Sequence, residues 1–113
     1  MIKTKSELSV TEILSGDKKA FSLFDLREFD GKADSLKQFS YVELESGQSV
    51  GYHVHEGDQD FYYIISGSGI YNDNGKEIAV ESGTITFTPS GEGHDLTNTG
   101  KEKLCFIALV VKN

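Results

Sequence analysis

Apolar and polar residues alternate in short stretches along most of the chain, which is the period of a β-strand. In KQFSYVELES (residues 37–46), Ser40, Val42 and Leu44 fall on one face of an extended strand, and Tyr41 and Glu43 fall on the other. Similar segments rich in Val, Ile, Thr, Tyr and Phe recur at FSLFDLREF (residues 21–29), SVGYHVH, DFYYIIS, GIYND, EIAV, TITFTP, HDLTNT and KLCFIALVV. The pattern predicts an all-β fold.

Turn-forming residues separate these predicted strands. In NDNGKE, the pair Asn74-Gly75 predicts a tight hairpin, because a primed turn needs positive φ at both central positions. Short strands with a turn about every eight to twelve residues are typical of a sandwich or barrel. The one weak helical pattern lies near residues 10–14, and no Pro/Ser-rich linker divides the chain, so we expect one domain over residues 1–113.

Composition narrows the classes of partner. The chain has 11 Lys and Arg against 18 Asp and Glu, a formal net charge of −7, which argues against a nucleic-acid or anionic-membrane partner. No apolar run approaches the length of a membrane span or of a signal peptide, and the single cysteine, Cys105, permits no internal disulfide. We therefore expect a cytoplasmic protein. An anionic small molecule is not excluded, because a bound metal can invert the local field.

The chain has only three histidines, and two of them lie in GYHVHEGDQD. His53 and His55 are two residues apart, so both point to the same face of a strand. The segment EGDQ then turns the chain, and a strand starting near Asp60 and returning antiparallel would bring its carboxylate back towards them. His94 could complete the set from a third strand. Imidazole and carboxylate suit Mn, Fe, Zn, Ni or Co, although H-x-H spacing alone also fits packed or solvated histidines.

Two longer patterns favour the metal site over that alternative. Gly47, His53, His55, Asp60 and Gly67 resemble the first motif of the cupin superfamily, G-x5-H-x-H-x(3,4)-E-x6-G. The second motif, G-x5-P-x-G-x2-H-x3-N, is matched by Gly83, Pro89, Gly91, His94 and Asn98. The resemblance spans residues 47–98 and implies a small jelly-roll β-barrel in which His53, His55, Asp60 and His94 surround one divalent transition metal.

Asp60 departs from the motif, which usually has Glu there. Its shorter side chain could bind the metal directly or through water, or the three histidines could hold the metal alone. Gln59 is a competing fourth ligand. The strand phase favours Asp60, because Gln59 then points away from the interior. Tyr62 shares the inward phase of Asp60, and Leu96 shares that of His94, so both are candidate pocket residues, and Gln59 is a third. Glu56 and Asp58 are interpreted as solvated turn acids.

The resemblance also bears on function. Cupins include sugar isomerases and epimerases, dioxygenases, decarboxylases and non-catalytic binders, so the fold alone does not give the reaction. We expect this protein to bind or convert a small polar molecule, sugar-like or an organic acid, in a metal-dependent way; the alternative is a binding module without turnover. The segments DFYYIIS and KLCFIALVV carry apolar residues on both faces of the strand. Both faces then need to be covered, and a partner subunit would cover the second one, which predicts a homodimer.

Overall fold

The computed structural model describes residue 2 and residues 4–11, 19–22 and 33–113, and within them the regular secondary structure is almost entirely antiparallel strand. A six-stranded sheet has the order β1-β2-β3-β10-β5-β8. Its strands are β1 (Ser9–Thr11), β2 (Lys19–Ser22), β3 (Leu36–Leu44), β10 (Leu104–Lys112), β5 (Asp58–Ser66) and β8 (Ile85–Thr88). A short 3-10 helix, Lys5–Glu7, precedes β1.

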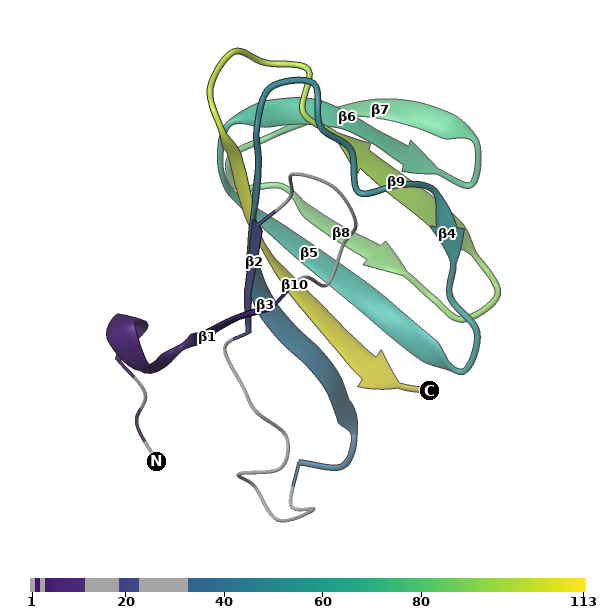
Figure 1. Ribbon diagram of the computed structural model, residues 1–113. Coiled ribbons are helices and arrows are strands. Elements are labelled where there is room, and N and C mark those ends of the chain that lie inside the picture. Colours follow the sequence, from purple (N-terminus) through teal and green to yellow (C-terminus); the bar gives the residue numbers. More distant parts are fainter. Residues whose placement is uncertain (1, 3, 12–18, 23–32) are drawn as a thin grey trace.

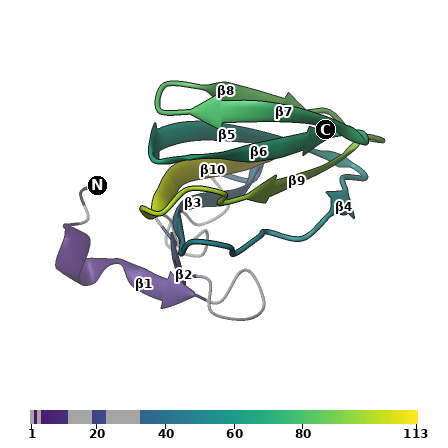
Figure 2. The same ribbon diagram turned by 90° about the horizontal axis from the view of Figure 1, so that it is seen from above.

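A four-stranded sheet with the order β4-β9-β6-β7 faces part of the larger one (Figures 1 and 2). Its strands are β4 (His53–Val54), β9 (Gly93–Thr97), β6 (Ser68–Asp73) and β7 (Lys76–Glu81). The sheets form separate hydrogen-bonded ladders and do not close on each other, so the expected barrel is an open jelly-roll sandwich.

The hydrophobic core lies between the sheets and follows the predicted alternation. Along β5, Tyr62 and Ile64 are buried, whereas Tyr63 and Ile65 between and beyond them are exposed. The remaining core side chains are Val42, Leu44, Val50, Tyr71, Val80, Leu96, Leu104, Phe106 and Ala108. Burial of one face of each strand fixes its register, because a slip of one residue would turn the apolar set towards water.

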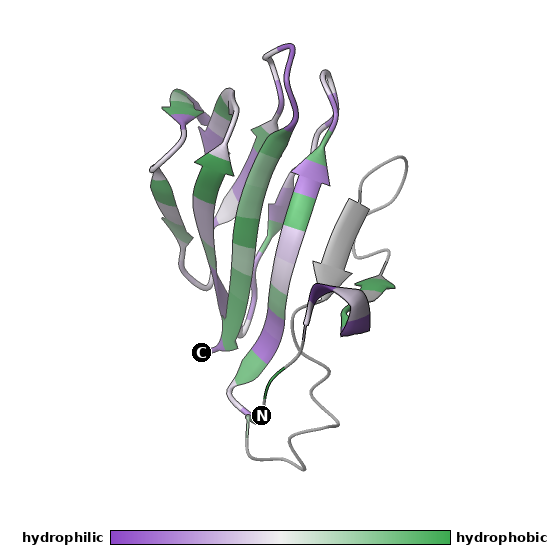
Figure 3. Ribbon diagram, turned by 90° about the vertical axis from the view of Figure 1, so that its left-hand side faces the viewer, coloured by the Kyte–Doolittle hydropathy of each residue, from purple (hydrophilic) through white to green (hydrophobic). Residues whose placement is uncertain are grey.

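The outer face of the six-stranded sheet also carries exposed apolar side chains. Figure 3 shows hydrophobic residues along most of β10, the strand that ends at the C mark. At the β8 edge of this sheet lies a group that we call the outer apolar patch: Tyr63, Ile65, Ile85 and Phe87, which are 50, 43, 69 and 49% exposed. Phe61 stacks on Phe87 beside it, with ring centroids 4.8 Å apart.

Several predicted elements differ from the observed ones. The NDNGKE hairpin is confirmed: Asn74 and Gly75 have φ of 53° and 95° and join β6 to β7. The predicted strand SVGYHVH is reduced to the two residues of β4 and one bridge, Ser49 to Thr97, because Gly51 turns the chain with φ of 94°.

Near the N-terminus, the weak helix predicted at residues 10–14 is wrong for its first two residues, which lie in the strand β1. Residues 12–14 lie outside the described part of the chain. The first two residues of the strand predicted at residues 21–29 belong to β2. Residues 23–29 also lie outside the described part of the chain. Within the described residues, no helix is long and apolar enough to cross a membrane.

Candidate metal centre

Four predicted ligands come together from both sheets. β4 pairs with β9 so that His53 lies directly opposite His94. His55 follows β4 and is held to the loop before β9 by two backbone hydrogen bonds, from its N–H to Glu92 O (3.0 Å) and from Gly91 N–H to its carbonyl (2.6 Å). Asp60 enters from β5 of the six-stranded sheet. The site therefore exists only where the two sheets meet.

The side chains converge through one atom each, and these four atoms lie within 4.8 Å of one another. His94 Nε2 is 2.9 Å from His53 Nε2 and 3.1 Å from His55 Nε2. Asp60 Oδ2 is 3.0 Å from His55 Nε2 and 3.2 Å from His94 Nε2. His94 and Asp60 are almost fully buried, His55 is buried, and His53 is half-buried.

The opposite ring nitrogen of each histidine is engaged by a fixed partner. His53 Nδ1 lies 2.8 Å from the carbonyl of Gly51, and His55 Nδ1 lies 2.7 Å from Asp58 Oδ1. Carbonyl and carboxylate oxygens only accept, so both Nδ1 atoms donate their proton and leave Nε2 with a free lone pair. This is the form in which a neutral imidazole binds a metal.

His94 has a different environment. Its Nδ1 lies 2.8 Å from the Tyr71 hydroxyl and 3.0 Å from the Thr88 hydroxyl, which are 2.7 Å from each other. Either hydroxyl can accept the Nδ1 proton and leave Nε2 available as a ligand. Burial raises the pKa of Tyr71, so this phenol keeps its proton and remains a hydrogen-bonding partner.

The arrangement fits a divalent transition-metal ion. Two ligand atoms that each lie about 2.1 Å from one ion are about 3 Å apart when their bonds meet at a right angle. The four atom pairs given above have separations close to this value. Burial lowers the pKa of His53, which favours the neutral ligand form. Asp60 Oδ1 is buried and has no hydrogen-bond partner in the described structure, so a cation at this point would meet an unsatisfied oxygen.

Comparison with known families matches residues 40–111 to the cupin domain, which is more than half of the chain. The protein is a cupin. The resemblance inferred from the two motifs is thereby confirmed, together with the jelly-roll fold that it implied.

Individual relatives point the same way. The oxalate-binding protein of Thermotoga maritima is 34% identical over 113 residues, which cover 98% of this chain and 93% of that protein. A crystal structure described as a predicted oxalate decarboxylase from Thermotoga maritima has a TM-score of 0.87 at 31% identity and covers 100% of both chains. An RmlC-like cupin from Shewanella frigidimarina covers 98% of this chain and 89% of its own, with a TM-score of 0.78 at 16% identity, a likeness of fold alone.

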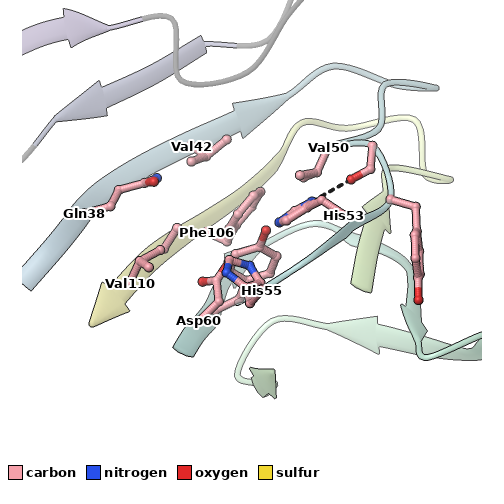
Figure 4. Close-up of a pocket in the computed structure, with 12 residues that line it drawn as sticks. Gln38, Val42, Val50, His53, His55, Asp60, Phe106 and Val110 are labelled. Carbon is pink, nitrogen blue, oxygen red and sulfur yellow. Dashed lines mark hydrogen bonds and ion pairs between the residues drawn. The ribbon is translucent and has the colours of Figure 1, made fainter. Parts of the chain in front are cut away.

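A cavity of about 440 Å³ opens beside the candidate metal centre of this cupin. In Figure 4, His53, His55 and Asp60 lie together, and Gln38 of β3 lies apart from them next to Val110 of β10. The full lining is Gln38, Val42, Val50, Gly51, Tyr52, His53, His55, Asp60, Tyr62, Phe106, Ala108 and Val110. Cavities of this size between the layers of a domain commonly hold small molecules.

Of the three predicted pocket residues, the structure places one at the cavity. Tyr62 lines it, and its ring lies 4.9 Å from that of His94. Leu96 does not, because its side chain is packed in the core. Gln59 is also not a lining residue: its amide donates to Asn113 Oδ1 at 3.0 Å, whereas Asp60 Oδ2 lies beside His55 and His94.

Asp58 was interpreted wrongly as a solvated turn acid. β5 begins at Asp58, two residues earlier than predicted, and this side chain is buried against His55 and Lys37. Its strand phase, shared with Asp60, was a sign that it points inward. Glu56 is exposed, as predicted. Asn98, the last residue of the second motif, donates to the carbonyls of Leu44 and Glu102 and accepts from the Gly100 N–H, so it holds the backbone.

Proposed function

We propose that this cupin holds one divalent transition-metal ion through His53, His55, Asp60 and His94, and that it binds a small organic acid such as oxalate at that ion. The convergence of three imidazole nitrogens and one carboxylate oxygen beside a cavity carries the proposal. Manganese, iron, zinc, nickel and cobalt all suit such ligands. When bound, the ion supplies the positive charge that an anionic ligand requires.

The charges around the cavity make the ion necessary for anion binding. Among the described residues that line it, none is a lysine or an arginine, and Asp60 contributes a negative charge. The whole chain carries a formal net charge of −7. A dicarboxylate entering the metal-free cavity would be repelled. The oxalate-binding relative from Thermotoga maritima supports oxalate as the first ligand to test.

Two lining side chains can recognise the part of the ligand that faces away from the ion. Tyr62 is 4% exposed, and burial raises its pKa well above the usual value, so its hydroxyl keeps its proton. Within the described structure this hydroxyl has no hydrogen-bond partner. The Gln38 side-chain amide likewise has none there, and it also reaches the cavity. Both groups can donate to carboxylate oxygens.

The cavity favours binding over acid–base catalysis. Apart from the proposed ligands, its titratable lining side chains in the described structure are Tyr52 and Tyr62. A general base works best when its pKa lies near the operating pH, and a buried tyrosine with a raised pKa does not meet this requirement. Sugar isomerisation or epimerisation, which removes a proton from carbon, is therefore a weaker candidate than ligand binding.

Dioxygenase chemistry is the second candidate function. Three histidines and one carboxylate leave one or two coordination positions for substrate or dioxygen, and no protein base is needed for that arrangement.

Calorimetric titration of oxalate into metal-stripped and metal-reconstituted protein tests the proposal. We expect about one metal ion per chain by elemental analysis, oxalate binding only to the reconstituted protein, and loss of both in the double variant His53→Ala/His94→Ala. A wild-type protein that retains no transition metal after reconstitution contradicts the metal site. Retention of metal without oxalate binding contradicts the ligand.

We also propose that the protein is a homodimer joined through the outer apolar patch. Ile85 and Phe87 on β8, beside Tyr63 and Ile65 on β5, form an uncharged exposed surface on a strongly acidic molecule. Light scattering should give twice the chain mass of 12.4 kDa. Ile85→Asp should give the monomer mass, whereas Ile78→Asp, an equally apolar exposed position on the other sheet, should not. A wild-type mass near 12.4 kDa at micromolar concentration rejects the dimer.

A cytoplasmic location, and the absence of nucleic-acid and membrane partners, stay predictions from composition.

A further inference from the structure

The three histidines of the metal centre differ in the charge of the group that holds Nδ1. His53 donates to a backbone carbonyl, and His94 meets two hydroxyls, all of them neutral. His55 alone donates to a carboxylate, Asp58 Oδ1, at 2.7 Å. Charge-assisted hydrogen bonds of this length are roughly twice as strong as neutral ones.

Asp58 is in turn fixed by a cation from a different strand. Lys37 Nζ of β3 donates to Asp58 Oδ2 at 2.8 Å, so the two carboxylate oxygens have separate partners. The Asp58 side chain is 12% exposed, and that of Lys37 is 46% exposed. The hydrogen bond from Lys37 is the main reason that the pKa of Asp58 lies below its usual value, which keeps the carboxylate charged. The result is a continuous path, Lys37–Asp58–His55, from the surface to the proposed metal.

We propose that Asp58, held by Lys37, is a positioning residue for the metal centre: it fixes the tautomer and the ring orientation of His55. A carboxylate that accepts from Nδ1–H prevents the proton from moving to Nε2, where it would block the ligand position. It also offsets the positive charge that the imidazole takes on when it binds an ion. This inference rests on the proposed function, because it concerns the same metal.

A purely structural role gives different expectations. If the Lys37–Asp58 ion pair only linked β3 to the start of β5, its loss would change the stability of the fold without a separate effect on His55. Half-exposed ion pairs contribute little stability, because solvent screens them. Two observations favour the positioning role: Asp58 contacts a proposed ligand, and within the described structure no carboxylate holds Nδ1 of His53 or His94.

The test uses Asp58→Asn, which keeps the shape of the side chain but removes its charge. An asparagine amide can donate to Nδ1 as well as accept from it, so the tautomer of His55 is no longer fixed. We expect metal affinity, measured by competition with a chromogenic chelator, to fall about 10- to 100-fold. Glu45→Gln is the matched control, because Glu45 forms an exposed ion pair with Lys103 at 3.7 Å, away from the site. It should leave metal affinity unchanged.

Nitrogen NMR of the metal-free protein shows which ring nitrogen of His55 carries the proton. A purely structural role of the Lys37–Asp58 pair would not affect this result. In the wild type we expect His55 to carry its proton on Nδ1, and in Asp58→Asn we expect a mixture of both tautomers. This measurement also separates the two proposals. If the wild type binds no metal, the proposed function fails, whereas the tautomer still decides whether Asp58 positions His55.

Variants of Lys37 extend the test in case Asp58→Asn folds poorly. Lys37→Met should lower metal affinity less than Asp58→Asn does, because Asp58 itself remains, and Lys37→Arg should restore it. Lys103→Met, which breaks the exposed pair with Glu45, is its control. The inference is overturned if the wild type binds metal and Asp58→Asn binds it equally well, or if the wild-type proton resides on His55 Nε2.

Discussion

Replacing Asp60 by Asn should change metal affinity and metal-free stability in opposite directions. In the metal-free protein, Asp60 Oδ2 lies 3.0 Å from His55 Nε2, whose lone pair is free because Nδ1 donates to Asp58. Asp60 Oδ1 is buried without a partner in the described structure. If His94 carries its proton on Nε2 in place of Nδ1, that N–H can donate to only some of the neighbouring acceptor atoms. The asparagine amide adds two donors at the same place.

The magnitude follows from these contacts. A buried polar atom without a partner costs about 1–3 kcal/mol, so Asp60→Asn should raise the free energy of unfolding of the metal-free protein by an amount in this range. For a domain of this size, about 1 kcal/mol moves the melting temperature by about 4 °C or more. Loss of one anionic ligand should weaken metal binding about 10- to 100-fold, or about 1.4–2.7 kcal/mol.

Two assays measure the two effects separately. Thermal or urea unfolding of protein stripped with a chelator reports metal-free stability, and a competition titration reports metal affinity. Gln59→Ala is the control at the next position of β5, because the Gln59 side chain contacts Asn113 rather than the cluster. It should leave metal affinity unchanged. Glu81→Gln, at an exposed position, controls for the change in net charge.

The reasoning is refuted if metal-free Asp60→Asn is less stable than the wild type while binding metal equally well. If Gln59→Ala lowers affinity and Asp60→Asn does not, the fourth ligand is Gln59 and the strand phase assigned to β5 is wrong. If neither matters, the three histidines alone hold the ion.

Three further predictions concern neighbouring residues. Tyr62→Phe should weaken oxalate binding about 10-fold in calorimetry without changing metal affinity, because it removes one hydrogen bond to a charged ligand. Asp60→Glu should retain metal without tightening it, since the Asp60 carboxylate already reaches His55 and His94, and a chelator competition will show this. Burial, a hydrogen bond with Cys105 and the charge of Glu43 raise the pKa of Tyr41 in the folded state. The unfolded chain therefore loses this proton first, so stability should fall as pH rises above about 10, and Tyr41→Phe should lessen that fall in alkaline urea titrations.

The sequence predicted the strands of this cupin well where one face is buried and the other is not. Alternation of Tyr62 and Ile64 with Tyr63 and Ile65 located β5 and its inward face, and the Asn74-Gly75 turn located the next hairpin. These are local properties, readable within a few residues. The grouping of His53, His55, Asp60 and His94 came from the two motifs, and the structure brings the four side chains together.

The parts that sequence reasoning missed depend on contacts between distant strands. Asp58 follows Gly57, where a solvated turn acid is the ordinary interpretation, and only its meeting with Lys37 of β3 makes it part of the site. Leu96 was assigned to the pocket by strand phase. Phase gives the face of a sheet, but it does not distinguish the part of that face under the core from the part that opens on the cavity.

The proposed metal centre would also join the two sheets, which do not close on each other, at one place. β4 and β9 contribute the histidines, and β5 contributes Asp60, so an ion bound by all four would link the four-stranded sheet to the six-stranded one. In the metal-free state, several hydrogen-bond acceptors lie together at this junction, and Asp60 Oδ1 has no partner in the described structure. Metal binding should therefore stabilise the protein most at this end, through β4 and the segment that leads to it. The cavity opens beside the same junction, so the shape offered to a ligand depends on the ion as well as on the charge that the ion supplies.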